Sequence, residues 1–174
     1  VGFEKMNTLP NAQIGEILLK ASYVREEADT PMGFAGVFGR IAEEYFQRFG
    51  DQSDALAAIS AKNHRNGMDN PYAHMRRDLG FDFCRHPSEK NPMVAGPLKR
   101  SDCSLVTDGA AALVISTEPA AAGRPSIRWR SRTQVNDYLQ LSKRDATRFE
   151  GAAQAWGKGL RNAGVGLDGL DFVE

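Results

Sequence analysis

The spacing of apolar residues changes along this chain from a helical repeat to a strand repeat, and this change constrains the fold more than any other feature. Between residues 34 and 49 the apolar positions recur every three or four residues, which is the pattern of one helix face. Residues 126–135 alternate instead, with three arginines on one side and Ile127, Trp129 and Val135 on the other. We therefore predict an amphipathic helix at 34–49, ended by Gly50, and a half-buried strand at 126–135.

Two further helices are expected in the first half of the chain. Asn11 is placed to cap a short helix, and Ser53 offers an N-cap oxygen to a second helix that the Asn-Gly pair at 66–67 ends. Residues 70–102 then show no repeat and are interrupted by four prolines. An ordered loop of this length is usually functional or packed on a partner surface. Within the order of elements along the chain, residues 9–100 are predicted to form a mostly helical insertion.

The second half returns to α/β elements. Residues 110–116 are small and apolar, as in a strand that is covered on both faces, and residues 117–125 have the composition of a linker. Apolar residues between 149 and 163 share one helix face, and Gly164 ends that helix. Residues 170–173 are predicted to begin a new strand. The resulting order of elements indicates an α/β fold.

Charge and composition exclude some partners. Lys plus Arg equals Asp plus Glu at 22 each, so the chain lacks the basic excess that is typical of proteins that bind nucleic acid or an anionic membrane. No stretch approaches the roughly 18 to 20 continuous apolar residues of a membrane span. Two cysteines suit neither a disulfide framework nor a metal motif, which favours a reducing compartment, with the cytoplasm as the expected location.

Neither cysteine has a nearby partner in sequence that would make it a nucleophile. A catalytic thiol needs a base or a helix N-terminus to lower its pKa, and none lies near Cys103, so we interpret Cys103 as a small buried thiol packed behind a strand. The same interpretation applies to Cys84. The spacing of His64, His74 and His86 does not match a metal-binding pair, and a histidine–cysteine pair could be assembled only by the fold.

Two groups of residues leave a functional and a structural interpretation open. Basic side chains could meet the phosphates of a nucleotide-like ligand, although a solvated surface is the commoner explanation. These residues are Arg76, Arg77, Lys90, Lys99, Arg100, Arg128, Arg130 and Arg132. The turn at 108–109 precedes three alanines and has little side-chain bulk, which allows either a ligand or a helix to approach the backbone closely.

Several segments, in order, carry a family resemblance. Residues 2–6 read Gly-Phe-Glu-Lys-Met, residues 62–64 read Lys-Asn-His, and residues 70–72 read Asn-Pro-Tyr. Residues 103–112 fit the pattern Cys-x-x-x-x-Asp-Gly-Ala-Ala-Ala, and residues 163–174 look like the lead-in to a Glu-x-His-Asp motif. Together they cover nearly the whole chain, and in this order they resemble the thiolase superfamily, closest to its sterol-carrier-protein and acetyl-CoA acetyltransferase-like members.

The resemblance implies an α/β fold, specifically a partial thiolase fold of α/β/α/β/α layers with a mostly helical loop domain inserted. Residues 1–8 would end the N-terminal core half, 9–100 would be the loop domain, 101–123 the return strand of that half, and 124–174 the start of the C-terminal half. It also implies that the chain is an interior piece of a longer enzyme.

The resemblance further implies acyl transfer between a 3-ketoacyl-CoA and CoA through a cysteine acyl-enzyme, with coenzyme A as co-substrate and no covalently bound cofactor. The family's catalytic groups would lie outside this chain, so we expect no catalytic residue and no metal site here, and no activity from the fragment alone. Ser104 is expected to line the channel for the pantetheine arm. Met6, Met32 and Gly33 are expected to border the acyl pocket.

Partners and alternatives also follow from the resemblance. The intact protein is expected to bind an acyl-CoA substrate, to act in fatty acid or sterol degradation, and to form a homodimer or homotetramer, with a small OB-type (DUF35) subunit as a possible partner. Neither nucleic acid nor a membrane is expected as a partner. Two alternatives stay open: a thiolase-like retro-aldolase that acts on CoA esters with a partner subunit, and a non-catalytic acyl-CoA binding module.

Overall fold

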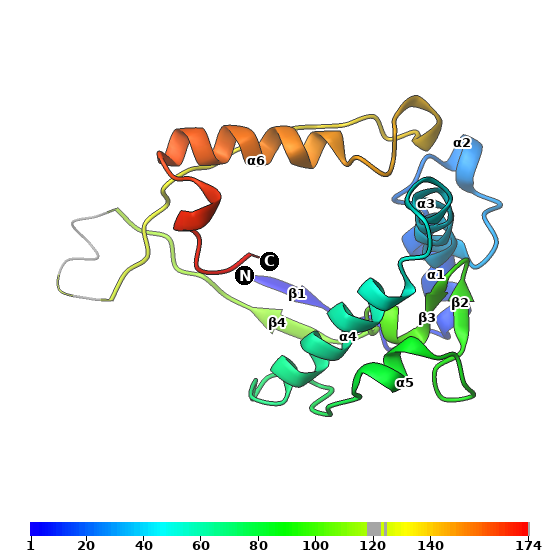
Figure 1. The fold of residues 1–174 in the computed structure, drawn as a ribbon. Coiled ribbons are helices and arrows are strands. Elements are labelled where there is room, and N and C mark those ends of the chain that lie inside the picture. The colour runs from blue at the N-terminus through cyan, green and yellow to red at the C-terminus, as the bar shows by residue number, and fades with distance from the viewer. Residues whose placement is uncertain (118–122, 124, 174) are drawn as a thin grey trace. The chain divides into compact units, whose positions relative to one another are not determined.

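The computed structural model describes residues 1–117, 123 and 125–173. The chain divides into two compact units, one of residues 2–110 and the other of residues 111–174 together with Val1 (Figure 1). We call them the N-terminal unit and the C-terminal unit. The predicted linker at 117–125 lies mostly outside the described residues.

Helices make up most of the N-terminal unit. They are α1 (Asn11–Leu19), α2 (Val24–Glu27), α3 (Gly33–Phe49), α4 (Ser53–Gly67) and α5 (Phe81–Arg85). Helix α1 packs against α3, and α4 packs against α5. Between α4 and α5 lies a small core of Ala57, Ala61 and Cys84, which Leu79 and Phe83 cover.

Helix α3 confirms the prediction made from the apolar repeat. It ends at Phe49, before Gly50 with a φ of 81°, a conformation that glycine adopts without strain. Glycines also set how closely the helix packs. A Cβ at Gly36 would lie 1.8 Å from the carbonyl oxygen of Pro31, and one at Gly39 would lie 2.8 Å from the Cβ of Ala95.

The two predicted helix caps are wrong in detail. Helix α1 begins at Asn11 itself, with Pro10 at the N-cap and no side-chain capping bond. Helix α4 begins at Ser53, and the Ser53 backbone N–H donates to Asp51 Oδ1 at 2.8 Å. The N-cap residue is Gln52, which makes no side-chain capping bond. Asp51 therefore accepts one of the free backbone N–H groups at this helix end, where the helix dipole also favours a negative charge.

Two small sheets accompany these helices. Strand β1 (Gly2–Glu4) pairs with β4 (Gly109–Ala111), and β2 (Met93–Ala95) pairs antiparallel with β3 (Leu98–Lys99). In the β2–β3 hairpin Gly96 has a φ of 51°, and a Cβ there would lie 2.8 Å from the carbonyl oxygen of Gly39 on α3. The hairpin therefore rests directly on the backbone of that helix.

The segment 70–102 contains more regular structure than its sequence indicated. It holds α5, the β2–β3 hairpin and the 3₁₀ turn η1 (Arg100–Asp102). Each of these elements has five residues or fewer, so none spans enough positions to show a repeat. The predicted ordered loop at 70–102 therefore contains short helices and strands that its sequence did not indicate.

The C-terminal unit contains one long helix, α6 (Glu150–Ala163). It ends at Gly164 with a φ of 66°, as predicted. Phe149, which was expected on the helix face, is instead the N-cap residue, with a φ of 47°. Two 3₁₀ turns, η3 (Leu141–Lys143) and η4 (Leu167–Gly169), lie on either side of α6 in the sequence.

The strand predictions in the second half of the chain are wrong. Residues 126–135 and 170–173 form no strand, and of 110–116 only the first two residues belong to β4. Ile127 is fully exposed and Trp129 is 73% exposed. Alternation identifies residues that suit a half-buried surface, but a strand also needs a hydrogen-bonded neighbour, and no described strand pairs with residues 126–135.

The described residues thus combine helices with two small two-stranded sheets, consistent with an α/β fragment. The layer order and the predicted domain boundaries stay predictions. Across the described part of the chain, no helix has both the length and the apolar character needed to cross a bilayer.

Candidate functional site

An open depression of about 420 Å³ in the N-terminal unit is the candidate site. Two segments far apart in sequence form its walls: the loop that follows α4 and the segment between η1 and β4. The lining residues are Tyr72, His74, Met75, Ser104, Leu105, Thr107, Asp108 and Gly109. Ser104, which the family resemblance marks as a pantetheine contact, therefore lies in the wall of this depression.

The depression offers a hydroxyl, an imidazole and an aromatic ring. Ser104 Oγ donates to the carbonyl oxygen of Leu105 at 3.4 Å, a long bond that a ligand could replace at little cost. Tyr72, which supplies the aromatic ring, is 89% exposed. His74 Nδ1 and Thr107 Oγ1 share a hydrogen bond, which joins the two walls.

Asp108 connects the depression to the segment that follows β1. Its Oδ1 accepts the backbone N–H of Met6 at 2.7 Å and that of Asn7 at 3.1 Å, and its Oδ2 pairs with Lys5 Nζ at 3.3 Å. The Asn7 and Met6 N–H donors, more than Lys5, hold the pKa of the Asp108 carboxyl below its usual range. Asp108 is therefore charged at neutral pH and tied to residues about 100 positions away.

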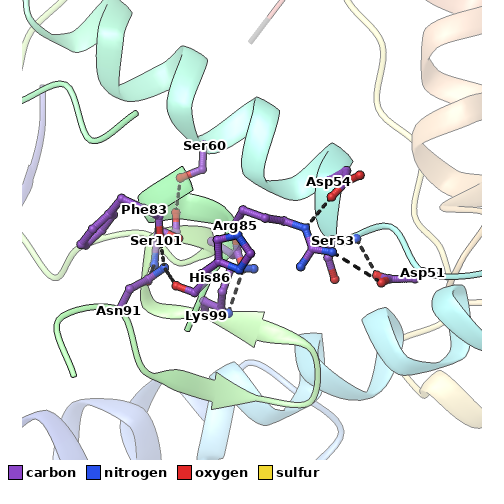
Figure 2. Close-up of polar contacts among 11 residues, drawn as sticks. Asp51, Ser53, Asp54, Ser60, Phe83, Arg85, His86, Asn91, Lys99 and Ser101 are labelled. Carbon is purple, nitrogen blue, oxygen red and sulfur yellow. Dashed lines mark hydrogen bonds and ion pairs between the residues drawn. The ribbon is translucent and has the colours of Figure 1, made fainter. Parts of the chain in front are cut away.

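A buried asparagine holds the other end of the same wall (Figure 2). Asn91 is fully buried, its Nδ2 donates to the carbonyl oxygen of Phe83 at 2.9 Å, and its Oδ1 accepts the Ser101 backbone N–H at 2.8 Å. Ser60 Oγ on α4 donates to the Ser101 carbonyl oxygen at 2.6 Å. The Ser101 backbone is thus fixed on both sides, three residues before Ser104.

Some of the basic residues considered as phosphate contacts instead bind groups within the protein. Lys99 is buried and forms a 2.8 Å ion pair with Asp102, so the structural interpretation holds for it. The Arg76 guanidinium donates to the Met68 carbonyl oxygen at 3.3 Å, and Arg130 donates to the carbonyl oxygen of Ala163 at 3.0 Å.

The surroundings of the two cysteines do not favour a nucleophilic role. Cys84 is fully buried in the core beside α4, which confirms its interpretation as a buried thiol. Cys103 is only partly buried and follows η1, so the expectation that it packs behind a strand is wrong. Burial, and secondarily the charge of Asp102, raise the pKa of the Cys103 thiol, which disfavours the thiolate that catalysis requires.

The four predicted contact residues do not lie together. Ser104 lines the depression, and Met6 is joined to it only through Asp108. Met32, with a φ of 63° and 64% exposed, and Gly33 lie at the start of α3, where a Cβ on Gly33 would be 3.2 Å from the carbonyl oxygen of Gly15. Neither residue lines the depression, and their role at an acyl pocket stays a prediction.

Of the eight lining residues, the sequence predicts only Ser104 as a contact. The aromatic residue that follows Asn-Pro is a sequence signal for Tyr72. Nothing in the sequence indicates the contacts of Asp108. Among the described residues, no group of three His, Cys, Asp or Glu side chains is arranged to hold a metal.

Comparison with curated proteins finds relatives along the whole chain. Acetyl-CoA acetyltransferases of Methanothermobacter thermautotrophicus and Methanocaldococcus jannaschii are each 26% identical over 99% of this chain. The chain is homologous to thiolase-type proteins. A benzoylsuccinyl-CoA thiolase subunit of Thauera aromatica is 30% identical over 48% of the chain and 20% of its own length, and human sterol carrier protein 2 is 25% identical over 68% of the chain and 22% of its own length.

The thiolase resemblance inferred from the motifs is thereby confirmed at the level of homology. The chain spans 44% of the length of the two acetyltransferases. No family model matches it, and no solved structure matches it either.

Proposed function

We propose that the intact protein is a thiolase-type acyltransferase and that the depression beside Ser104 binds the CoA part of its substrate. Two of the relatives are acetyl-CoA acetyltransferases that align with almost the whole chain. The observation that carries the proposal is the place of Ser104, because a residue chosen from a family resemblance proves to line the described depression.

The lining suits a CoA ester chemically. Ligand sites combine apolar walls with a few polar groups, and here Met75 and Leu105 supply apolar surface while Ser104 supplies a hydroxyl. The pantetheine arm carries amides that accept and donate hydrogen bonds. The exposed ring of Tyr72 offers a face on which an adenine base can stack, and stacking of this kind does not require hydrogen bonds to the base.

The proposed reaction proceeds through a cysteine acyl-enzyme. A cysteine thiolate adds to the 3-keto carbonyl of a 3-ketoacyl-CoA, the carbon–carbon bond breaks, and the departing acetyl-CoA enolate takes up a proton. The thiolate of a second CoA then attacks the acyl-cysteine and releases the shortened acyl-CoA. We assign none of these steps to Cys84 or Cys103, and we place the catalytic groups in parts of the intact protein outside this chain.

A second candidate function is a non-catalytic acyl-CoA binding module. The observation that favours it is the burial of Cys84 and the raised pKa of the Cys103 thiol, which leave no activated thiol among the described residues. The retro-aldolase with a partner subunit stays an alternative that follows from the family resemblance alone, whereas one relative, a thiolase subunit by name, favours a thiolase with more than one subunit. Assembly as a homodimer or homotetramer, a small OB-type partner and a cytoplasmic location belong to the same proposal.

Calorimetric titration of the chain with CoA and with pantetheine tests the binding proposal. We expect saturable binding of both ligands and a loss of roughly three- to tenfold in affinity for Ser104→Ala, the usual effect of removing one hydrogen bond. Ser126→Ala, which removes an exposed serine of the C-terminal unit, is the matched control and is expected to bind like the unchanged chain. No saturable binding, or equal effects of the two substitutions, would refute the proposed site.

A thiolysis assay separates the candidate functions. The 174-residue chain is expected to show no turnover, and turnover would contradict our placement of the catalytic groups. For the intact protein, turnover of acetoacetyl-CoA with CoA supports the acyltransferase, whereas binding without turnover supports the binding module.

A further inference from the structure

We propose that Asp108 is the positioning residue of the depression: its carboxylate sets the 104–108 wall against residues 5–7 in the geometry that a CoA ester requires. This inference rests on the proposed function and extends it to a residue in the wall of the depression. Three contacts carry it, from the backbone N–H groups of Met6 and Asn7 and from the side chain of Lys5.

The Asp108 contacts reinforce a very short pair of strands. Strands β1 and β4 have three residues each, and a two-stranded pair of this length is marginal by itself. Asp108 directly precedes β4, and residues 5–7 directly follow β1. Because hydrogen bonds to a charged carboxylate are stronger than neutral ones, the Asp108 contacts add substantially to the short ladder in holding these two strand ends together.

A shift of Asp108 would also move its neighbours in the wall of the depression. Asp108 follows Thr107, whose hydroxyl bonds to His74 on the opposite wall. The wall is fixed at its other end at Ser101, by Asn91 and Ser60. Loss of the Asp108 contacts therefore frees one end of the wall and displaces Thr107 from His74, and displacements of about 1 Å are enough to weaken a positioned site.

A carboxylate with the same local chemistry lies in the C-terminal unit and serves as a matched control. Asp137 accepts the backbone N–H groups of Tyr138 at 2.7 Å and Gly151 at 3.1 Å, and it pairs with Arg144 at 3.5 Å. It does not line the depression. A merely structural role of Asp108 would resemble the role of Asp137, so the two can be compared directly.

The experiment compares Asp108→Ala, Asp108→Asn and Asp137→Ala with the unchanged chain. Amide hydrogen exchange is measured at Met6, Asn7 and residues 104–107 without ligand, and the CoA dissociation constant is measured by calorimetry. We expect Asp108→Ala to raise both the exchange rates and the dissociation constant by about tenfold or more. Asp108→Asn keeps an oxygen that accepts the backbone N–H groups and is expected to show intermediate values. Asp137→Ala is expected to stay within about twofold in both measurements.

The outcomes separate this inference from the proposed function. Exchange at 104–107 that is the same in Asp108→Ala as in the unchanged chain overturns the inference, as does an equal loss of CoA affinity in Asp137→Ala. Failure of the unchanged chain to bind CoA refutes the proposed function, while the exchange comparison still judges the wall. If Asp108→Ala does not fold by circular dichroism, Asp108→Asn decides: unchanged exchange and affinity overturn the inference, and intermediate values support it.

Discussion

Lys99 Nζ lies 2.8 Å from Asp102 Oδ2, and neither side chain is more than 3% exposed. The same carboxylate oxygen accepts the Lys99 backbone N–H at 2.8 Å, which closes a compact turn just before the wall of the depression. A buried pair of this kind offsets its desolvation cost only while both charges are present.

Removing one member of that pair is therefore expected to be more harmful than removing both. Lys99→Met should lower the free energy of unfolding by about 3–5 kcal/mol, and adding Asp102→Leu should recover much of the loss. Urea denaturation measures both variants. Arg65→Met breaks the exposed ion pair with Asp78 and is expected to change little. A double variant no more stable than Lys99→Met would contradict this account.

Asn91 is expected to be a second stability determinant. Asn91→Ala leaves the Phe83 carbonyl and the Ser101 N–H without their partner inside the protein, so the free energy of unfolding should fall by roughly 2 kcal/mol or more. The exposed Asn66 of α4 provides the control substitution Asn66→Ala. Equal effects of the two substitutions in urea denaturation would show that the Asn91 network contributes no stability.

The Tyr72 ring predicts a difference between two ligands. If adenine stacks on it, Tyr72→Ala should weaken binding of CoA by about tenfold but leave binding of pantetheine, which has no base, unchanged. Tyr72→Phe keeps the ring face and should bind CoA normally. Calorimetric titration measures all four combinations, and an equal loss for CoA and pantetheine would place the ring against the pantetheine arm.

The two cysteines should differ in alkylation. Burial raises the pKa of the Cys103 thiol above its ordinary value of 9.0, so its reaction with iodoacetamide should rise only at a higher pH than that of a free thiol, while Cys84 should react only on unfolding. A raised pKa in the folded state stabilises the fold below the pKa of the unfolded thiol, and this contribution is lost as the pH rises through the folded value. Peptide mass mapping after timed alkylation follows each thiol, and fast labelling of Cys103 at pH 7 would contradict the prediction.

Acid should weaken the chain through Asp108 and Asp137. Hydrogen bonds from backbone N–H groups lower the pKa of both carboxyls, so their stabilisation is present above the pKa of the unfolded carboxyl and is lost as the pH falls through the lower folded value. Asp108→Asn and Asp137→Asn should each flatten the fall of the unfolding midpoint below pH 3.8, the ordinary pKa of the carboxyl. The double variant should show the sum, because the residues lie in separate units. Thermal unfolding between pH 2 and 5 measures this, and slopes identical to that of the unchanged chain would contradict it.

The sequence predicted the long helices because their signal is local. Helices α3, α4 and α6 carry their apolar repeats and terminal glycines within about 20 residues, and all three form close to the predicted bounds. Strands depend on partners that sequence periodicity does not identify. The pairing of β1 with β4 joins residues about 100 positions apart, and the alternating segment 126–135 has no described partner.

The site shows the same division. Ser104 was predicted as a ligand contact from family motifs that keep their order along the chain; it lines the depression, and its role as a contact stays a prediction. The contacts of Asp108 with Met6 and Asn7 arise only when β1 and β4 meet, so no local pattern could indicate them. The contact of His74 with Thr107 was likewise not indicated, because Thr107 lies 33 residues away.

The contact between α3 and the β2–β3 hairpin, at Gly39 and Gly96, affects the position of one wall of the depression. The helix and the hairpin approach so closely at these two glycines that a side chain at either position would clash with the backbone or side chain opposite it. A methyl group at either position would push the hairpin away from the helix, and β3 leads directly through η1 into the segment that carries Ser104. Gly39 and Gly96 thereby set the distance between α3 and the hairpin that leads to Ser104.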